Sequence, residues 1–114
     1  MGGGFIPDGL FEFSPIWRNF LDNATTVQFD HRIMAYIIAG LSIVTLIRSL
    51  HATIAIRNAA FLLAFAVFFQ VVLGIITLVT YVPVIWGTLH QAGGVLVLAA
   101  LLLLIHNQRK YEAR

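Results

Sequence analysis

The chain has 114 residues, of which 60% are hydrophobic and only 11% are charged. A soluble domain of this size is less apolar, so the composition predicts a membrane protein. The formal net charge is +2 and the basic residues are scattered, which excludes a nucleic-acid interface. The chain has no cysteine, so disulfides, thiolate metal sites and cysteine nucleophiles are excluded.

Residues 1–27 are predicted to be a separate segment outside the membrane. Four charged residues interrupt this segment too often for a membrane span: Asp8, Glu12, Arg18 and Asp22. Ser14-Pro15 indicates a helix start, with Ser14 as the N-cap and proline at the first helical position. The apolar residues that follow recur at helical spacing: Ile16, Trp17, Phe20 and Leu21. We expect a short amphipathic helix, either in the headgroup region with Trp17 as an anchor or packed as a lid on the membrane helices.

Residues 28–114 contain three long apolar stretches, which predict membrane helices over about 28–50, 58–81 and 84–106. The first stretch is bounded by Arg32 and Arg48, which we expect near the two interfaces with their aliphatic stems in the bilayer. No charged residue occurs between Asn58 and Gln108, and Pro83 is the break that divides this run into two helices. The short connection makes those two helices antiparallel neighbours.

The distribution of basic residues predicts the orientation in the membrane. Five of them are expected on the cytoplasmic or matrix side: Arg48, Arg57, Arg109, Lys110 and Arg114. The segment 1–27 then lies on the outer side, a placement that leads us to expect further helices before residue 1. The predicted fold is an all-α membrane protein, in which three transmembrane helices form part of a four-helix-bundle half and follow an outer amphipathic helix.

Two histidines lie on different predicted membrane helices and near the same outer side. His31 is at the outer end of the first helix, and His90 is about seven residues into the third. Ionisable groups at such depth are costly and usually functional, and neutral imidazole is a good axial ligand for haem iron. Small residues at −3, +3 and +4 from His90, which are Gly87, Gly93 and Gly94, either leave room for a porphyrin or allow close helix packing. We predict that His31 and His90 ligate one haem; the alternative for His90 is a hydrogen-bonded packing residue.

Further polar residues on these helices have two interpretations each. Gln70, Gly74 and Thr77 share one face of the second helix, where they either pack against a neighbouring helix or form a pocket wall. Arg32 either pairs with a haem propionate or has a structural role, as an interfacial anchor or as the partner of Asp30. Two other histidines at helix ends, His51 and His106, are expected to be solvated. The sequence contains no catalytic constellation of nucleophile and base.

Several short motifs resemble, in their order along the chain, the C-terminal half of heme A synthase. They are Pro7-Asp8-Gly9-Leu10-Phe11-Glu12, Ser14-Pro15, Trp17-Arg18-Asn19-Phe20, Val27-Gln28-Phe29-Asp30-His31-Arg32, Leu73-Gly74-Ile75 with Thr77-Leu78, and His90-Gln91-Ala92-Gly93. The resemblance covers nearly the whole chain. It is closest to the form found in mitochondria and related bacteria, which implies a bacterial or mitochondrial inner membrane.

This resemblance implies an oxidoreductase with eight transmembrane helices in two similar halves, which oxidises the heme O methyl group to the formyl group of heme A. By resemblance, His31 and His90 are the metal ligands of haem b in the C-terminal half, and we group Arg32, Gln70 and Gly94 with them as cofactor-binding residues. The other half carries the substrate haem and a glutamate three residues before its first histidine. This chain has Gln28 at that position, so we assign it no catalytic residue.

The chain departs from the family pattern in two ways, and other functions stay open. It has three spans rather than eight, and Ile16-Trp17 stands where tryptophan is usually doubled. Expected partners are membrane lipid, haem, a missing N-terminal half or a second copy of the chain, and cytochrome oxidase assembly factors. The alternatives are a non-enzymatic bis-histidine cytochrome b-type anchor and a structural membrane fragment without a cofactor. Haem content and conversion of heme O to heme A distinguish these functions.

Overall fold

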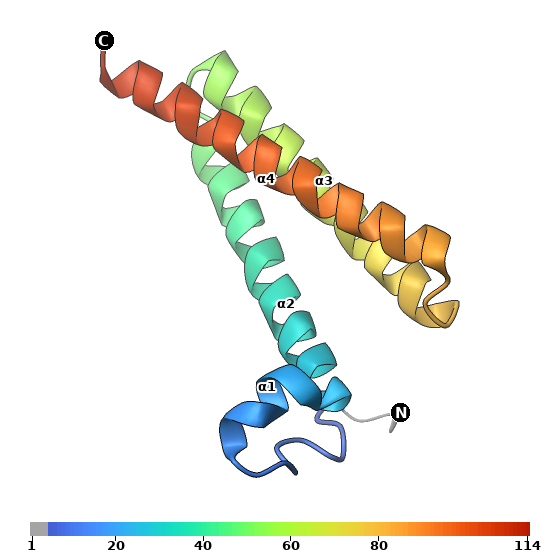
Figure 1. Cartoon of the computed structure of the whole chain (residues 1–114). Helices are drawn as coiled ribbons and strands as arrows, with labels where there is room; N and C mark the ends of the chain where they lie inside the picture. The colour runs from blue at the N-terminus through green and yellow to red at the C-terminus, as the bar shows by residue number, and fades with distance from the viewer. Residues whose placement is uncertain (1–4) are drawn as a thin grey trace. The chain divides into compact units, whose positions relative to one another are not determined.

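The computed structural model describes residues 5–114, and over this range the chain contains helices and turns but no strand (Figure 1). A short 3-10 helix and an α-helical turn come first, and three long helices follow. The elements in chain order are η1 (Ile16–Arg18), α1 (Asn19–Asp22), α2 (Ala24–Ser49), α3 (Ile54–Val79) and α4 (Val84–Glu112).

The chain divides into two compact units, Met1–Ile37 and Ile38–Arg114, and α2 runs from the first into the second. We call the described part of the first, residues 5–37, the N-terminal unit, and we call α3 with α4 the α3–α4 hairpin. Helices α2, α3 and α4 have 26, 26 and 29 residues, and each is apolar enough to cross a membrane. At ~1.5 Å per residue the shorter two reach about 39 Å, more than the ~30 Å of a bilayer core. The predicted all-α membrane fold with three spanning helices is confirmed.

The long helices extend beyond the ends expected from the charge pattern. Helix α2 begins at Ala24 rather than near Gln28, because the Asn23 side chain caps it: the Asn23 Oδ1 accepts hydrogen bonds from the backbone N–H groups of Thr25 and Thr26 at 3.1 and 3.3 Å. Helix α4 continues to Glu112 instead of ending near residue 106. Basic residues in the last turn are favourable at a helix C-terminus, so they extend this helix rather than end it.

The interior of the N-terminal unit is polar. Asn19 and Thr26 are completely buried, and Asn23 is 6% exposed. The Asn19 side chain donates to the carbonyl oxygens of Phe13 and Ile16 at 2.8 and 2.9 Å and accepts from the Phe13 N–H at 2.8 Å. The Asn23 side chain donates to the Gly9 carbonyl oxygen at 2.7 Å. Two asparagines therefore hold the loop before η1 onto the helices that follow it.

These bonds correct the predicted helix start. η1 begins at Ile16, so proline occupies the N-cap position and no side chain caps the helix. The prediction that Ser14 is the N-cap is wrong, because Asn19 binds the backbone on both sides of that position. The apolar residues predicted to share a helix face do lie outside: Ile16, Trp17, Phe20 and Leu21 are 51–71% exposed. The segment thus has a polar interior and an apolar exterior.

The α3–α4 hairpin packs around small side chains. Ala59 and Ala60 of α3 and Ala100 of α4 are at most 4% exposed, and larger apolar residues complete this core: Ile56, Leu63, Val67 and Leu104. Small residues let two membrane helices approach closely. In the turn, the Val82 N–H donates to the Thr77 carbonyl oxygen at 2.8 Å. At the far end, the Asn107 side chain donates to the Ala55 carbonyl oxygen at 3.3 Å. The hairpin is therefore tied at both ends.

Candidate functional site

Three of the five predicted site residues come together in the α3–α4 hairpin. Gln70 projects from α3, and His90 and Gly94 lie on α4. The other two, His31 and Arg32, lie on the part of α2 that belongs to the N-terminal unit. The pairing of His31 with His90 across the two units stays a prediction.

The His90 imidazole rests against the backbone of Gly74. A methyl group on Gly74 would lie 3.0 Å from the ring carbon Cε1, 3.5 Å from Nδ1 and 3.7 Å from Nε2. The first distance is shorter than ordinary van der Waals contact, so any larger residue at this position would displace the ring. The ring nitrogen Nδ1 is buried. The missing side chain of Gly74 therefore forms a notch that the imidazole occupies.

A second contact of this kind has the roles of the helices reversed, because a side chain of α3 packs against a glycine of α4. The Gln70 side-chain Nε2 donates a hydrogen bond to the backbone carbonyl oxygen of His90. The Gln70 Oε1 lies so close to Gly93 that a methyl group there would overlap it. At the next residue, Gly94, a methyl group would lie at an ordinary 3.6 Å from Nε2. The Gln70 amide thus occupies the notch of Gly93 in particular.

The two contacts are reciprocal. Gln70 and Gly74 are one helical turn apart on α3, and His90 and Gly93 are nearly one turn apart on α4. Each helix inserts one polar side chain into a glycine notch of the other. The prediction that Gln70 and Gly74 pack against a neighbouring helix is confirmed. Thr77 is also buried, but its hydroxyl donates to the Leu73 carbonyl oxygen of its own helix at 2.7 Å rather than to a neighbouring helix.

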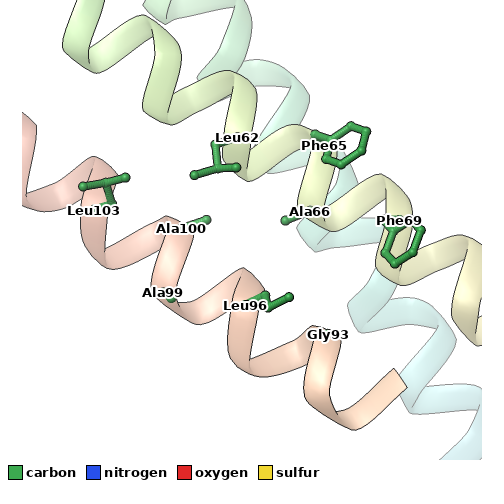
Figure 2. Close-up of a pocket in the computed structure, with 9 residues that line it drawn as sticks. All are labelled: Leu62, Phe65, Ala66, Phe69, Gly93, Leu96, Ala99, Ala100 and Leu103. Atoms are coloured by element: carbon green, nitrogen blue, oxygen red, sulfur yellow. The ribbon is translucent and has the colours of Figure 1, made fainter. Parts of the chain in front are cut away.

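An apolar cavity of about 420 Å³ lies between α3 and α4 and reaches Gly93 (Figure 2). Its lining residues on both helices carry no polar side chain: Leu62, Phe65, Ala66, Phe69, Gly93, Leu96, Ala99, Ala100 and Leu103. The rings of Phe65 and Phe69 are stacked, with centroids 6.4 Å apart and an angle of 13° between their planes. Such a surface suits a flat apolar group or an acyl chain, and it offers no acid or base for chemistry.

In the N-terminal unit, His31 is exposed and Arg32 is half-buried on α2. Within residues 5–114 the ion pair in the structure joins Arg18 to Asp22 at 3.2 Å, so the alternative that pairs Arg32 with Asp30 is not supported. His51, in the turn after α2, and His106, inside α4 because this helix continues to Glu112, are both exposed. Sequence reasoning missed the buried Asn19 and its bonds to the loop, although an asparagine among apolar neighbours was a visible signal.

The donor set fits a haem better than a metal ion held by protein alone. Among residues 5–114, no three His, Asp or Glu side chains gather closely enough to hold a metal ion. A haem needs only one or two protein ligands, because the porphyrin supplies four nitrogens, and neutral imidazole suits its iron. His31 and His90 both lie in the N-terminal halves of their helices, α2 and α4, so they remain the candidates.

Comparison with known proteins gives one family. The sequence model of a family described as cytochrome oxidase assembly protein matches residues 1–102. A heme A synthase of Parvibaculum lavamentivorans is 40% identical over 110 residues, and one of Beijerinckia indica is 45% identical over 101 residues. A heme A synthase of Arabidopsis thaliana is 40% identical over 112 residues.

These alignments cover most of this chain but a minor part of each relative. They include 96%, 84% and 96% of this chain, and 31%, 28% and 24% of the three relatives in the same order. No solved structure matches the chain. The chain therefore spans about a third or less of the length of the curated relatives that it matches.

Proposed function

Because the chain belongs to the cytochrome oxidase assembly protein family, whose members similar to it are heme A synthases, we propose that it is the haem b-holding part of such an enzyme. The part corresponds to the C-terminal half, by the motifs around His31 and His90. The complete enzyme would oxidise the methyl group of heme O to the formyl group of heme A. The observation that carries the proposal is the identity of about 40% with heme A synthases over 96% of the chain.

In this function, His31 and His90 would hold one haem b, which would supply one-electron transfer when bound. The chain would supply the two imidazoles from separate membrane helices, and the contact with Gly74 would orient the His90 ring. Arg32, half-buried at the start of the spanning part of α2, would face a propionate. The apolar wall beside Gly93 would keep water away from this side of the site.

The chain would depend on the rest of the enzyme for the reaction itself. Gln28 occupies the position where the other half of the family has a glutamate, and a carboxamide has no acid or base function at neutral pH. Within the membrane-spanning helices of the described residues, the acidic side chains are Asp30, in the second turn of α2, and Glu112, the last residue of α4. Membrane lipid, the N-terminal half and oxidase assembly factors are the partners that this role requires.

The test is the haem content and absorption spectrum of the chain, expressed with and without the N-terminal half of a related heme A synthase. We expect a low-spin b-type spectrum that His31→Ala or His90→Ala abolishes or converts to a weak five-coordinate one. The matched controls His51→Ala and His106→Ala should leave it unchanged. Heme A should form only when the N-terminal half is present.

Three results would contradict the proposal. A low-spin spectrum that survives the double His31/His90 substitution would remove both ligand assignments. Heme A made by the chain alone, in a host that supplies heme O and lacks its own synthase, would show that this part carries the reacting site. A spectrum without any heme A in the complemented system would favour the bis-histidine anchor instead.

A further inference from the structure

We propose that Gln70 and Gly74 of α3 are positioning residues for His90, and that Gly93 is the element of α4 that allows Gln70 to act. The proposal rests on the proposed function in taking His90 as a haem ligand. The contacts themselves involve only residues of the α3–α4 hairpin. Neither glutamine nor glycine would touch the iron, so their effect passes through the histidine.

The first step is the hold on the main chain. A helical carbonyl oxygen has two lone pairs, and the N–H four residues later uses one of them. At His90 the Gln70 amide donates to the same oxygen. This bond fixes the axial position of α4 relative to α3 at His90, the residue proposed to bind the haem. It forms between two helices in an apolar surrounding, where water does not compete for the donor.

The second step is the hold on the ring. The ligand strength of a histidine depends on the orientation that its surroundings impose on the imidazole. The Gly74 notch admits the edge of the ring that contains Cε1, between the two nitrogens. A methyl group 3.0 Å from Cε1 would turn or shift the ring. Gly74 thus sets the orientation of the His90 imidazole, while Gln70 sets the position of His90 along α3.

The third step explains why two adjacent glycines differ. A methyl group on Gly93 would overlap Gln70 Oε1, whereas one on Gly94 would make an ordinary contact of 3.6 Å with Nε2. Gly87 is also one turn from His90, but no atom of the described residues lies within 4 Å of a methyl group added there. A methyl group added at Gly93 should therefore displace the Gln70 amide, whereas one added at Gly87 should not.

The experiment compares these methyl additions in the 114-residue chain, purified from membranes with bound haem. Gly74→Ala and Gly93→Ala should each shift the low-spin electron paramagnetic resonance signal and speed haem loss about tenfold or more. The matched control Gly87→Ala should stay within about twofold of the unsubstituted chain. Equal effects of Gly87→Ala and Gly74→Ala would overturn the assignment of Gly74.

A double substitution separates positioning from misfolding. If Gly93→Ala acts by striking the Gln70 amide, it should have no further effect once Gln70→Ala has removed that amide. Gln70→Ala alone should shift the haem signal less than Gly93→Ala, because it removes the bond without a collision. An equal effect of Gly93→Ala in both backgrounds would overturn the proposal for Gln70.

A haem-free measurement keeps this inference distinct from the proposed function. The chain has no native cysteine, so spin labels are attached at cysteines that replace Leu62 and Leu103, which lie on opposite walls of the apolar cavity (Figure 2). Gly93→Ala should lengthen the distance between the labels, and adding Gln70→Ala should restore it. If these distance changes occur but no haem spectrum depends on His90, the ligand role of His90 is rejected. The reciprocal contacts of Gln70 with Gly93 and of His90 with Gly74 are then retained. An unchanged distance between the two labels in Gly93→Ala would overturn the proposal that the Gln70 amide packs against Gly93.

Discussion

Asn19 in the N-terminal unit and Ala60 in the α3–α4 hairpin are both completely buried, yet their surroundings are opposite. The asparagine is held by hydrogen bonds to the backbone of a loop, and the alanine by close contact between two helices. Both units expose large apolar side chains, among them Trp17 and Phe65, at 61% and 66%. Because both units expose large apolar side chains, their interiors are what distinguishes them.

The difference has a physical cause. A loop has backbone groups without helical partners, and those groups must be satisfied when they are buried or lie near lipid. Helices satisfy their own backbone, so a helix pair gains most from side chains small enough for close approach. We therefore expect the N-terminal unit to be sensitive to loss of polar groups and the hairpin to be sensitive to added volume.

The largest expected effect is that of Asn19→Ala. It removes the partners of the Phe13 N–H and carbonyl oxygen and of the Ile16 carbonyl oxygen, which should destabilise the N-terminal unit by about 3 kcal/mol. Fluorescence of Trp17 in a Trp86→Phe background during denaturation measures this unit. The exposed Ser14→Ala in the same loop is the control. Equal stability of the two variants would show that the polar interior is not what holds the loop.

The next effect is that of Ala60→Leu in the hairpin. The position is 0% exposed and faces α4, so the added carbons must push the helices apart, at a cost of about 2 kcal/mol. Fluorescence of Trp86 in a Trp17→Phe background reports on the hairpin. The control is Ala92→Leu at an exposed position of α4. A hairpin that tolerates leucine at both positions would refute packing by small residues.

The smallest expected effect is that of Asp22→Asn. It breaks the ion pair with Arg18, whose side chain is 48% exposed against 51% for the aspartate. Exposed pairs contribute little, and an arginine that precedes its acid on a helix is the weaker arrangement, so about 0.3 kcal/mol is expected. The same Trp17 measurement at low and high salt checks it. A loss comparable with that of Asn19→Ala would mean that charges, rather than amides, organise this unit.

Several features were predictable from the sequence, because they depend on composition along one helix. Apolar length predicted three spanning helices, and Pro83 predicted the break between α3 and α4. The helix ends were less predictable. The Asn23 cap lies in a polar stretch that was assigned to the outer segment, and the basic end of α4 was taken as a boundary although charges near a C-terminus favour the helix.

The helix faces of the α3–α4 hairpin were predictable from the sequence, but their contacts were not. Gln70 and Gly74 share a face of α3, which predicted contact with another helix. Which residues they contact depends on the axial position of α4 relative to α3. That position is set by the turn between the helices, in which Tyr81 and Val82 adopt left-handed backbone conformations with φ of 61° and 56°. A β-branched residue rarely adopts this conformation, so no sequence rule anticipates it.

The ties along the α3–α4 hairpin have a consequence for the order of assembly. They join residues 5, 20 and 52 positions apart, from the Val82 turn through Gln70 and His90 to Asn107 and Ala55. Each tie leaves the next one a shorter loop to close, and short loops lose less entropy on closure. The hairpin can therefore close progressively from its turn. We expect the position of His90 relative to α3 to be established before the two ends of the hairpin meet.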